Sequence, residues 1–278
     1  MPQRSIHFPT PERQAERLSP LFQILKDSFE ARRAEIQQSP EGVDPDQVIV
    51  FETIGTVDNF ITAVKNTAGL EWLGEIEIDD INPTDDFFDE DNAEKPLSGR
   101  LFLTMSNQRA MEQLLSLWTQ YLRNPQMQFR RGLGGFKALF GKLKDVRKWD
   151  VQDRLIETGV LDYWRRDLEK GEETIRFELQ LWYSNSLNKR EQVHNNILSI
   201  ISELEGRCIA SSIIPEISYH ALLIELPAKE IRRIIENQST RLVRYDDIMF
   251  FRPTGQICVD EVANNEEKII CIILSMLY

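Results

Sequence analysis

The carboxy-terminal half of the chain carries the pattern that most limits its fold. Between Phe177 and Pro253, segments of alternating apolar residues, which predict strands, are separated by segments whose apolar residues recur every three or four positions, which predict helices. The predicted order is strand, helix, strand, strand, helix, strand, the split β-α-β arrangement of a ferredoxin-like module. We therefore expect residues 175–256 to form one such module.

Local signals set the expected limits of these elements. A capping box formed by Asn188 and Glu191 begins the first helix, which ends at Gly206. Pro227 begins the second helix, because proline is favoured in the first turn. The four strands are expected at Phe177–Ser184, Arg207–Ile214, Tyr219–Leu226 and Arg241–Pro253, and the tight turn at Pro215–Ser218.

The first part of the chain repeats most of this order. Residues 1–45 predict an amino-terminal helix with the apolar stripe Leu18, Leu21, Phe22, Leu25 and Phe29. In residues 46–170, three strands are expected at 48–55, 71–78 and 99–106, with helices capped by Asp58 and Ser106. The predicted class is α+β: two tandem ferredoxin-like (βαββαβ-type) modules, an amino-terminal helix, and a helical insert between the modules.

Two charged segments interrupt the first module. Residues 79–94 hold eight acidic residues and no base, but they lack the EF-hand spacing, so we expect a solvated or disordered loop rather than a calcium site. Residues 130–148 hold seven Lys or Arg and one acid, and they include a glycine-rich stretch expected to be a flexible hinge. Arg130, Arg131 and Lys137 are candidates for contacting an acidic partner, although a solvated helix face is the simpler interpretation.

Composition excludes several classes of protein. The 278 residues are 41% apolar and 28% charged, which excludes a largely disordered chain, a collagen and a coiled-coil rod. The net charge of −12 argues against binding nucleic acid or an anionic membrane over the whole surface. Three scattered cysteines, the lack of a signal peptide and an apolar run about half as long as a membrane span predict a cytoplasmic protein.

The motifs of common catalytic sites are missing from the sequence. No G-x-S-x-G, phosphate-binding glycine loop or RNA-binding signature occurs. His7, His194 and His220 are expected to be surface histidines in a tail, a helix and a strand. We therefore expect no catalytic residue, no metal and no cofactor.

Three segments resemble a known family. They are residues 48–78, residues 101–155 and residues 219–256, with Arg147–Leu155 and Asp246–Gln256 the most specific parts. Across roughly residues 15–256, the chain resembles the amino-terminal region of bacterial subtilisin-like serine peptidases encoded beside an AAA-type ATPase, a pairing associated with phage defence. In that family a catalytic domain follows this region. Its Asp, His and Ser motifs are absent here, so the resemblance extends to the accessory region and not to peptidase activity.

The resemblance also implies how the second module would work. Subtilisin propeptides are small β-α-β-β-α-β modules whose sheet packs on the catalytic domain and whose carboxy-terminal tail lies in the substrate cleft. The tail candidates here are Phe250, Phe251, Arg252, Pro253, Thr254, Gly255 and Gln256. Alternatively, Phe250 and Phe251 serve only the packing of the last strand.

The expected function is therefore a non-catalytic, propeptide-like and regulatory region that inhibits or chaperones a subtilisin-like peptidase domain, in cis or in trans, or docks an AAA-type ATPase. The alternative is a stand-alone module that binds a protein or nucleic acid through residues 130–148. For the propeptide-like, regulatory function we expect neither a nucleic-acid nor a membrane partner. Residues 257–278 are an atypical carboxy-terminal tail that ends in the apolar run Ile269–Tyr278, which favours a truncated or frame-shifted gene.

Overall fold

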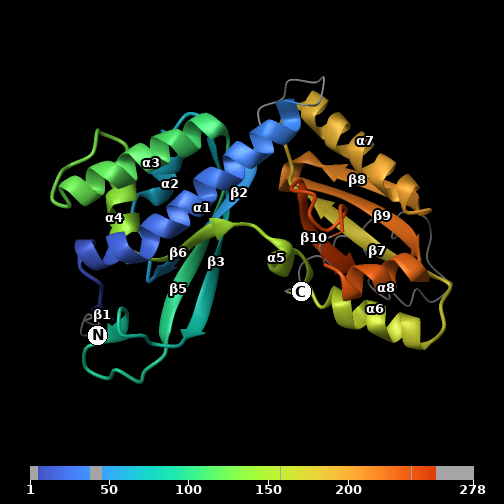
Figure 1. Cartoon of the computed structure of the whole chain (residues 1–278), viewed down its shortest axis with the longest axis horizontal. Coiled ribbons are helices and arrows are strands. Elements are labelled where there is room, and N and C mark those ends of the chain that lie inside the picture. Colours follow the sequence, from blue (N-terminus) through green and yellow to red (C-terminus); the bar gives the residue numbers. More distant parts are fainter. Residues whose placement is uncertain (1–5, 38–45, 157, 239, 255–278) are drawn as a thin grey trace. The chain divides into compact units, whose positions relative to one another are not determined.

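The computed structural model describes residues 6–37, 46–156, 158–238 and 240–254 (Figure 1). The chain divides into two compact units, Met1–Trp149 and Asp150–Tyr278. Each unit combines α-helices with a four-stranded antiparallel sheet, so the predicted α+β class is confirmed.

The sheet of the first unit has the strand order β3-β5-β2-β6, with every neighbouring pair antiparallel. Counted along the chain within this sheet, the order is second, third, first, fourth. Its elements are β2 (Gln47–Ile54), α2 (Phe60–Lys65), β3 (Leu70–Ile81), β5 (Leu97–Ser106), α3 (Gln108–Arg123), α4 (Gly134–Lys142) and β6 (Leu143–Lys148).

The amino-terminal helix α1 (Pro11–Gln37) belongs to the core of this unit, as its apolar stripe predicts. Leu18, Phe22 and Phe29 are buried, and Phe22 packs against Trp118 of α3 with ring centroids 5.0 Å apart. The buried amide of Gln14 donates hydrogen bonds to the carbonyl oxygens of residues 140 and 143, at 2.9 and 3.0 Å. This amide therefore supplies a hydrogen-bond donor to the backbone carbonyl groups where α4 ends and β6 begins.

Strand β6 corrects the prediction that the basic segment is wholly a helical insert. Residues 143–148 pair antiparallel with β2, where Phe51 lies opposite Val146. Leu143 and Val146 are buried, and the polar residues between them are half-buried. The two buried residues are three positions apart, because the pairing with β2 shifts between Asp145 and Leu143. This spacing resembles that of a helix, so the sequence alone suggested a continuing helix.

The acidic segment is folded and is neither a disordered nor a merely solvated loop. Its strand β4 (Phe88–Asp89) pairs with β1 (Ile6–His7), and Phe87 is buried in a small apolar cluster. Arg13 Nε donates to Asp86 at 2.9 Å, and this hydrogen bond lowers the pKa of Asp86 below its ordinary value. The aspartate thereby ties the segment to α1.

The sheet of the second unit has the order β10-β7-β9-β8 and is again antiparallel throughout. Read from β8 to β10, its strands are the second, third, first and fourth along the chain, as in the first unit. Its elements are α5 (Val151–Leu155), α6 (Val160–Glu169), β7 (Thr174–Leu181), α7 (Leu187–Glu203), β8 (Arg207–Ile214), the short 3-10 helix Pro215–Ile217, β9 (Tyr219–Pro227), α8 (Ala228–Glu236) and β10 (Ile248–Pro253).

Helices α5 and α6 lie in the second unit, whereas the sequence analysis placed residues 150–170 with the first module. The reason is Trp164 of α6, whose ring is buried 4.9 Å from Phe177 and 5.9 Å from Phe251. This helix looks like a surface helix because its other positions are mostly charged. Trp164 and the equally buried Val160 nevertheless anchor it on the core of the second unit.

The helix caps differ by one or two residues from those predicted. Asn107, not Ser106, caps α3 by accepting a hydrogen bond from the Ala110 amide at 2.9 Å. Ser186, not the box at Asn188, precedes α7 and accepts from the amide of residue 189. Asn59 in the left-handed conformation, rather than Asp58, precedes α2. Such shifts arise because several residues near a helix end can cap it, and tertiary packing selects one.

Candidate functional site

Strand β10 holds most of the carboxy-terminal candidate residues and divides them between two faces. Phe251 is fully buried and stacks with Phe177 in the core, so it serves packing. Phe250 is half-buried on the opposite face, where the Arg252 guanidinium lies 4.9 Å from its ring centroid. Thr254 Oγ1 is 2.9 Å from the Tyr163 hydroxyl.

Two of the tail candidates cannot be placed, because Gly255 and Gln256 lie outside the described residues. Pro253 is half-buried opposite Phe177 at the end of β10. Of the tail candidates that the structure describes, Phe250 and Arg252 are therefore the two that lie together on the face of the sheet opposite the core.

The face of the second sheet that carries Phe250 and Arg252 is called the β10-side face here. The strand register assigns to it the residues that alternate with the core-facing ones. Its members are Arg176, Glu178, Gln180, Arg207, Ala210, Ser212, Ile214, Tyr219, Ala221, Leu223, Glu225, Phe250 and Arg252. Most are polar or of moderate size, whereas the helix-covered face is wholly apolar in its centre.

An ion-pair network crosses three strands of the β10-side face. Glu225 accepts a hydrogen bond from Arg176 Nε of β7 and another from Arg207 Nε of β8, each at 2.8 Å. These bonds lower the pKa of the Glu225 carboxyl. Both guanidinium groups remain largely exposed, so the network presents positive charge around a buried carboxylate.

A second polar pair lies closer to β10 on the same face. Glu178 stands opposite Arg252 in the register and shares a hydrogen bond with the Tyr219 hydroxyl. Burial raises the pKa of Glu178, and burial together with the Glu178 charge raises the pKa of Tyr219. The carboxyl is therefore held in a partly desolvated environment beside the Phe250 and Arg252 pair.

The two sequence segments most specific to the family resemblance meet at one side chain. Arg154, in the first segment, donates from Nε to the Ile248 carbonyl and from Nη1 to the Val243 carbonyl, both at 3.0 Å. Its Nη2 donates to Asp246 Oδ1 at 3.2 Å. Burial lowers the pKa of Arg154, and the guanidinium is retained because each of these acceptors compensates its lost hydration. The sequence analysis assigned no role to Arg154. Its place beside the apolar Leu155 was the one local sign that its side chain could be buried.

The basic segment divides into a paired part and an exposed part. Lys144 forms an ion pair with Glu52 of β2, and Lys142 Nζ donates to the Thr56 carbonyl at 2.7 Å. Arg147 Nε lies 3.7 Å from Asp145. These cations therefore hold the strand β6 and the end of α4 in the first unit.

The three basic candidates fall in the other part of this segment. Arg130 and Arg131 are exposed on the connection between α3 and α4, and Lys137 is half-buried on α4. The opposite side of α4 carries Phe136 and Phe140, which are fully buried. The helix is thus a piece of the core with a small cationic edge.

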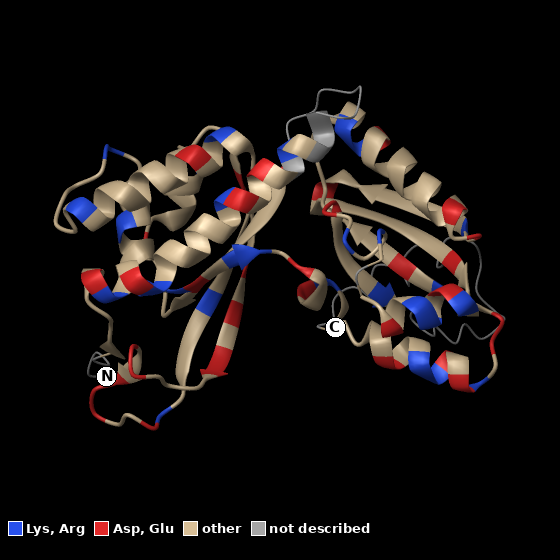
Figure 2. Cartoon of the chain, viewed as in Figure 1, with Lys and Arg blue, Asp and Glu red and all other residues tan. Residues whose placement is uncertain are grey.

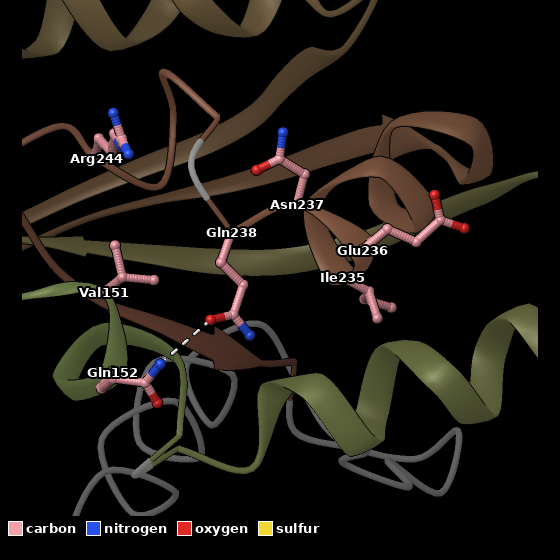
Figure 3. A pocket seen from close by; sticks show the side chains of 7 residues that line it. All are labelled: Val151, Gln152, Ile235, Glu236, Asn237, Gln238 and Arg244. Atoms are coloured by element: carbon pink, nitrogen blue, oxygen red, sulfur yellow. Dashed lines mark hydrogen bonds between the residues drawn. The ribbon is translucent and has the colours of Figure 1, made fainter.

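A shallow hollow of about 460 Å³ lies between α5 and the end of α8 in the second unit (Figure 3). Figure 3 shows Gln152 and Gln238 pointing toward one another, with Gln152 Nε2 donating to Gln238 Oε1 at 3.4 Å. The lining residues are Val151, Gln152, Ile235, Glu236, Asn237, Gln238 and Arg244. None of them is a histidine, cysteine or serine that could act as a nucleophile or general base.

His220 is buried, contrary to the expectation of a surface histidine. Its side chain is 1% exposed, and neither ring nitrogen has a hydrogen-bond partner. His194 of α7 lies parallel to it, with ring centroids 5.9 Å apart. Burial lowers the pKa of His220 to about 4, and the positive charges of His194 and Arg190 act in the same direction. The neutral imidazole is therefore the form that fits this core.

We expect this histidine to make the second unit sensitive to acid. The folded-state pKa lies below the unfolded value of about 6.5, so the unfolded chain binds more protons between these values and stability falls as the pH falls. The opening free energy of β9 should drop by about 2 kcal/mol between pH 7 and pH 5 from this group. Amide hydrogen exchange of β9 peptides measures the change, because it follows the second unit alone.

The control for this prediction compares two histidine variants. His220→Gln should abolish the histidine-dependent part of the pH response, whereas His7→Gln in the first unit should leave it unchanged. An identical pH response in the chain and in His220→Gln would contradict the assignment.

Within the described ranges, no group of three or more His, Cys, Asp or Glu side chains is arranged to hold a metal ion. Every helix in those ranges falls short of the length and hydrophobicity needed to span a lipid bilayer.

Comparisons with known proteins add little. No family model matches the chain, and no curated protein matches it. One solved structure, the crystal structure of an unknown protein from Galdieria sulphuraria, matches over 70% of this chain and 94% of that one, at 8% identity and a TM-score of 0.20. A likeness this weak supports no argument about fold or function.

Proposed function

We propose that this chain is the non-catalytic, propeptide-like and regulatory region of a subtilisin-like serine peptidase. In this proposal its second unit holds a peptidase domain, inhibiting it or assisting its folding, under the control of an AAA-type ATPase and in the context of phage defence. Both units are proposed to be ferredoxin-like modules, which the shared strand order and the connecting helices support.

The observation that carries the proposal is the unlike character of the two faces of the second sheet. One face is buried by apolar side chains of α6, α7 and α8, including Trp164, Ile197 and Ile231. The β10-side face instead carries the ion-pair network of Glu225 and the Phe250–Arg252 pair. A sheet face that mixes fixed charges with aromatic surface is suited to a protein interface, because such interfaces are enriched in aromatic residues and arginine.

Strand β10 gives this interface a direction. It is an edge strand, its residues Phe250 and Arg252 lie on the β10-side face, and the described part of the chain ends at Thr254, directly after the strand. An extended segment that leaves a sheet edge can pair with a strand of a partner, gaining main-chain hydrogen bonds while alternate side chains fill pockets. This arrangement supports the proposal that Phe250 and Arg252 contact the peptidase domain just before the chain enters its substrate cleft.

The alternative of nucleic-acid binding through residues 130–148 is less favoured by the contacts of that segment. Lys144, Arg147 and Lys142 engage groups of the first unit and Lys148 also has a partner, so the cations that remain in the segment are Arg130, Arg131 and Lys137. Each phosphate contact contributes separately to electrostatic affinity, so three cations give weak, salt-sensitive binding at most.

Inhibition of a subtilisin-like peptidase tests the proposed function. The full chain is titrated into a subtilisin-like catalytic domain, and hydrolysis of a fluorogenic peptide is followed. We expect concentration-dependent inhibition, and at least tenfold weaker inhibition by the double variant Phe250→Ala, Arg252→Ala, since both side chains contact the partner in this proposal. A second readout is the recovery of activity when the unfolded catalytic domain refolds with the chain present.

A matched control is Arg165→Ala on α6, whose exposed guanidinium pairs only with Asp162 in the part of the chain described. This variant should inhibit as the unmodified chain does. The proposal would be overturned if the chain inhibited none of several subtilisin-like domains and improved the refolding of none of them. Equal inhibition by the double variant would overturn the role of the β10-side face.

A further inference from the structure

The four edges of the two large sheets differ in how they are protected against pairing with another strand. The sheet orders make β3, β6, β8 and β10 the edge strands. Strand β3 carries five acidic residues, β6 carries four charged residues, and β10 ends in Arg252 and Pro253. Charges and proline are the usual protection of an edge, because an unpaired strand otherwise templates association.

Strand β8 lacks this protection. Between Cys208 and Ile214 it has neither a charged residue nor a proline, and Figure 2 shows its ribbon uncharged along the middle. Ile209 and Ile213 are 42% and 44% exposed on this strand. An uncharged edge with exposed β-branched residues is well suited to adding a strand.

We propose that β8 pairs antiparallel with β8 of a second copy of this chain, so that two second sheets join into one sheet of eight strands. The interface is formed by the backbone edge of β8, which borders the β10-side face at the end of the sheet away from β10, and it does not depend on the proposed function. The sequence Cys208–Ile214 is self-complementary about Ser211. When Ser211 faces Ser211 of the second copy, Ile209 faces Ile213 of that copy, and the reverse pair forms by symmetry.

This register satisfies the side-chain period of a sheet. The pairing of β8 with β9 shifts between Cys208 and Ala210, so Ile209 lies at a β-bulge. Counted back from Ala210, the alternation still places Ile209 on the same face as Ser211 and Ile213, and the two isoleucines can meet across the twofold axis. Ile213 stands opposite His220 in the existing register, on the face covered by the helices. The two Ile209–Ile213 pairs would bury β-branched side chains that are now partly in water, and such cross-strand pairs stabilise sheets.

The charges at the two ends of β8 also favour a second copy as the occupant. The strand begins with Arg207 and is followed by the exposed Glu216. In this register Arg207, which already pairs with Glu225 of its own chain, lies opposite residue 215 of the other copy and therefore next to its Glu216, so an opposite charge is nearby at both ends of the paired strands. A chain with a net charge of −12 repels its own copies, and the uncharged stretch Cys208–Ile214 adds no like-charge contact of its own to that repulsion.

Pairing through β8 produces a closed dimer rather than a fibre. The joined sheet ends at β10 on both sides, where Arg252 and Pro253 oppose further strand addition. The same strand is used by both copies, so the contact is isologous and stops at two chains.

Sedimentation of the full chain over a range of concentrations tests the proposal. We expect a monomer–dimer equilibrium, and Ile213→Lys should raise the dimer dissociation constant at least tenfold, since each substitution enters the interface twice. Leu187→Lys is the matched control, because Leu187 is 57% exposed in the same unit but lies on α7. It should leave the equilibrium unchanged.

Cysteine cross-linking tests the register itself, in a chain whose three natural cysteines are replaced by serine. Ser211→Cys should form an intermolecular disulfide under mild oxidation, because the two residues face each other. Ser212→Cys should not, because the two Ser212 residues are offset by two positions, about 8 Å apart, beyond the reach of a disulfide.

Three results would overturn the inference. They are a monomer at every concentration, a dimer unaffected by Ile213→Lys, and equal cross-linking at positions 211 and 212. Binding of a foreign extended peptide to a monomeric chain would likewise show that β8 pairs with another partner and not with itself.

Discussion

Replacing Arg154 with alanine should cost the second unit about 3–5 kcal/mol of unfolding free energy, the range for removing one partner of a buried ion pair. The guanidinium is 2% exposed and the Asp246 side chain is 8% exposed. Without Arg154, the Asp246 charge and the carbonyls of Val243 and Ile248 would lose their donor in a buried place. Each such loss carries the desolvation cost of an unsatisfied group.

The measurement is hydrogen exchange of β7 and β10 amides, which reports the opening of this unit alone. Arg165→Ala is the control, since an exposed ion pair contributes about 0–1 kcal/mol. Arg154→Lys should fall between the two, because a lysine retains the charge but not the three-directional donation. A cost below about 1 kcal/mol for Arg154→Ala would show that the guanidinium is not the element that holds the loop before β10.

Replacing Gly135 with alanine should destabilise the first unit by about 3 kcal/mol, the upper part of the range for overpacking. A Cβ at Gly135 would lie 2.7 Å from the Asn59 carbonyl carbon and 2.8 Å from Phe60 Cα. These are backbone atoms, so they cannot move away as a flexible side chain would. Phe60 also packs against Phe51, Phe102 and Phe136, so a shift of α2 would disturb the centre of the core.

The neighbouring glycine supplies a matched control. A Cβ at Gly134 would meet no atom within 4 Å, so Gly134→Ala should be neutral or should stabilise the unit by up to about 1 kcal/mol. Thermal unfolding and hydrogen exchange of β2 amides compare the two variants. Equal stability of Gly134→Ala and Gly135→Ala would contradict the close approach of α2 and α4.

These glycines also change the interpretation of the segment in which they lie. The sequence suggested a flexible hinge between Arg130 and Gly135. In the structure Gly132 adopts a φ of 90°, which favours glycine, and Gly135 lets two helices approach closely. The glycine run therefore serves packing; of the three cationic candidates, Lys137 lies on α4, and Arg130 and Arg131 lie on the connection that leads into it.

Much of the fold was predictable where one residue period persists for a whole element. In β7 the alternation of Ile175, Phe177, Leu179 and Leu181 places four buried residues on one face, and the stripe of α1 buries in the same regular way. Such elements are encoded locally, because period and burial follow from backbone geometry alone.

The elements that the sequence did not reveal depend on distant partners. Residues 143–148 form a strand because they pair with β2. The acidic segment folds because Arg13 pairs with Asp86 and Phe87 is buried in an apolar cluster. His220 could not be recognised as buried, because its burial depends on α7 packing over the sheet.

The candidate site shows the same division. The sequence by itself determined that a strand ends at Phe250–Pro253 and that its residues alternate between two faces, because alternation is a property of the strand. Only the tertiary structure decided that Phe251 is core, that Phe250 and Arg252 share the other face with the Glu225 network, and that Arg154 joins two segments about ninety residues apart. The physical reason is that a charge far along the chain becomes a partner only after the apolar core has brought it near, and no local pattern records that approach.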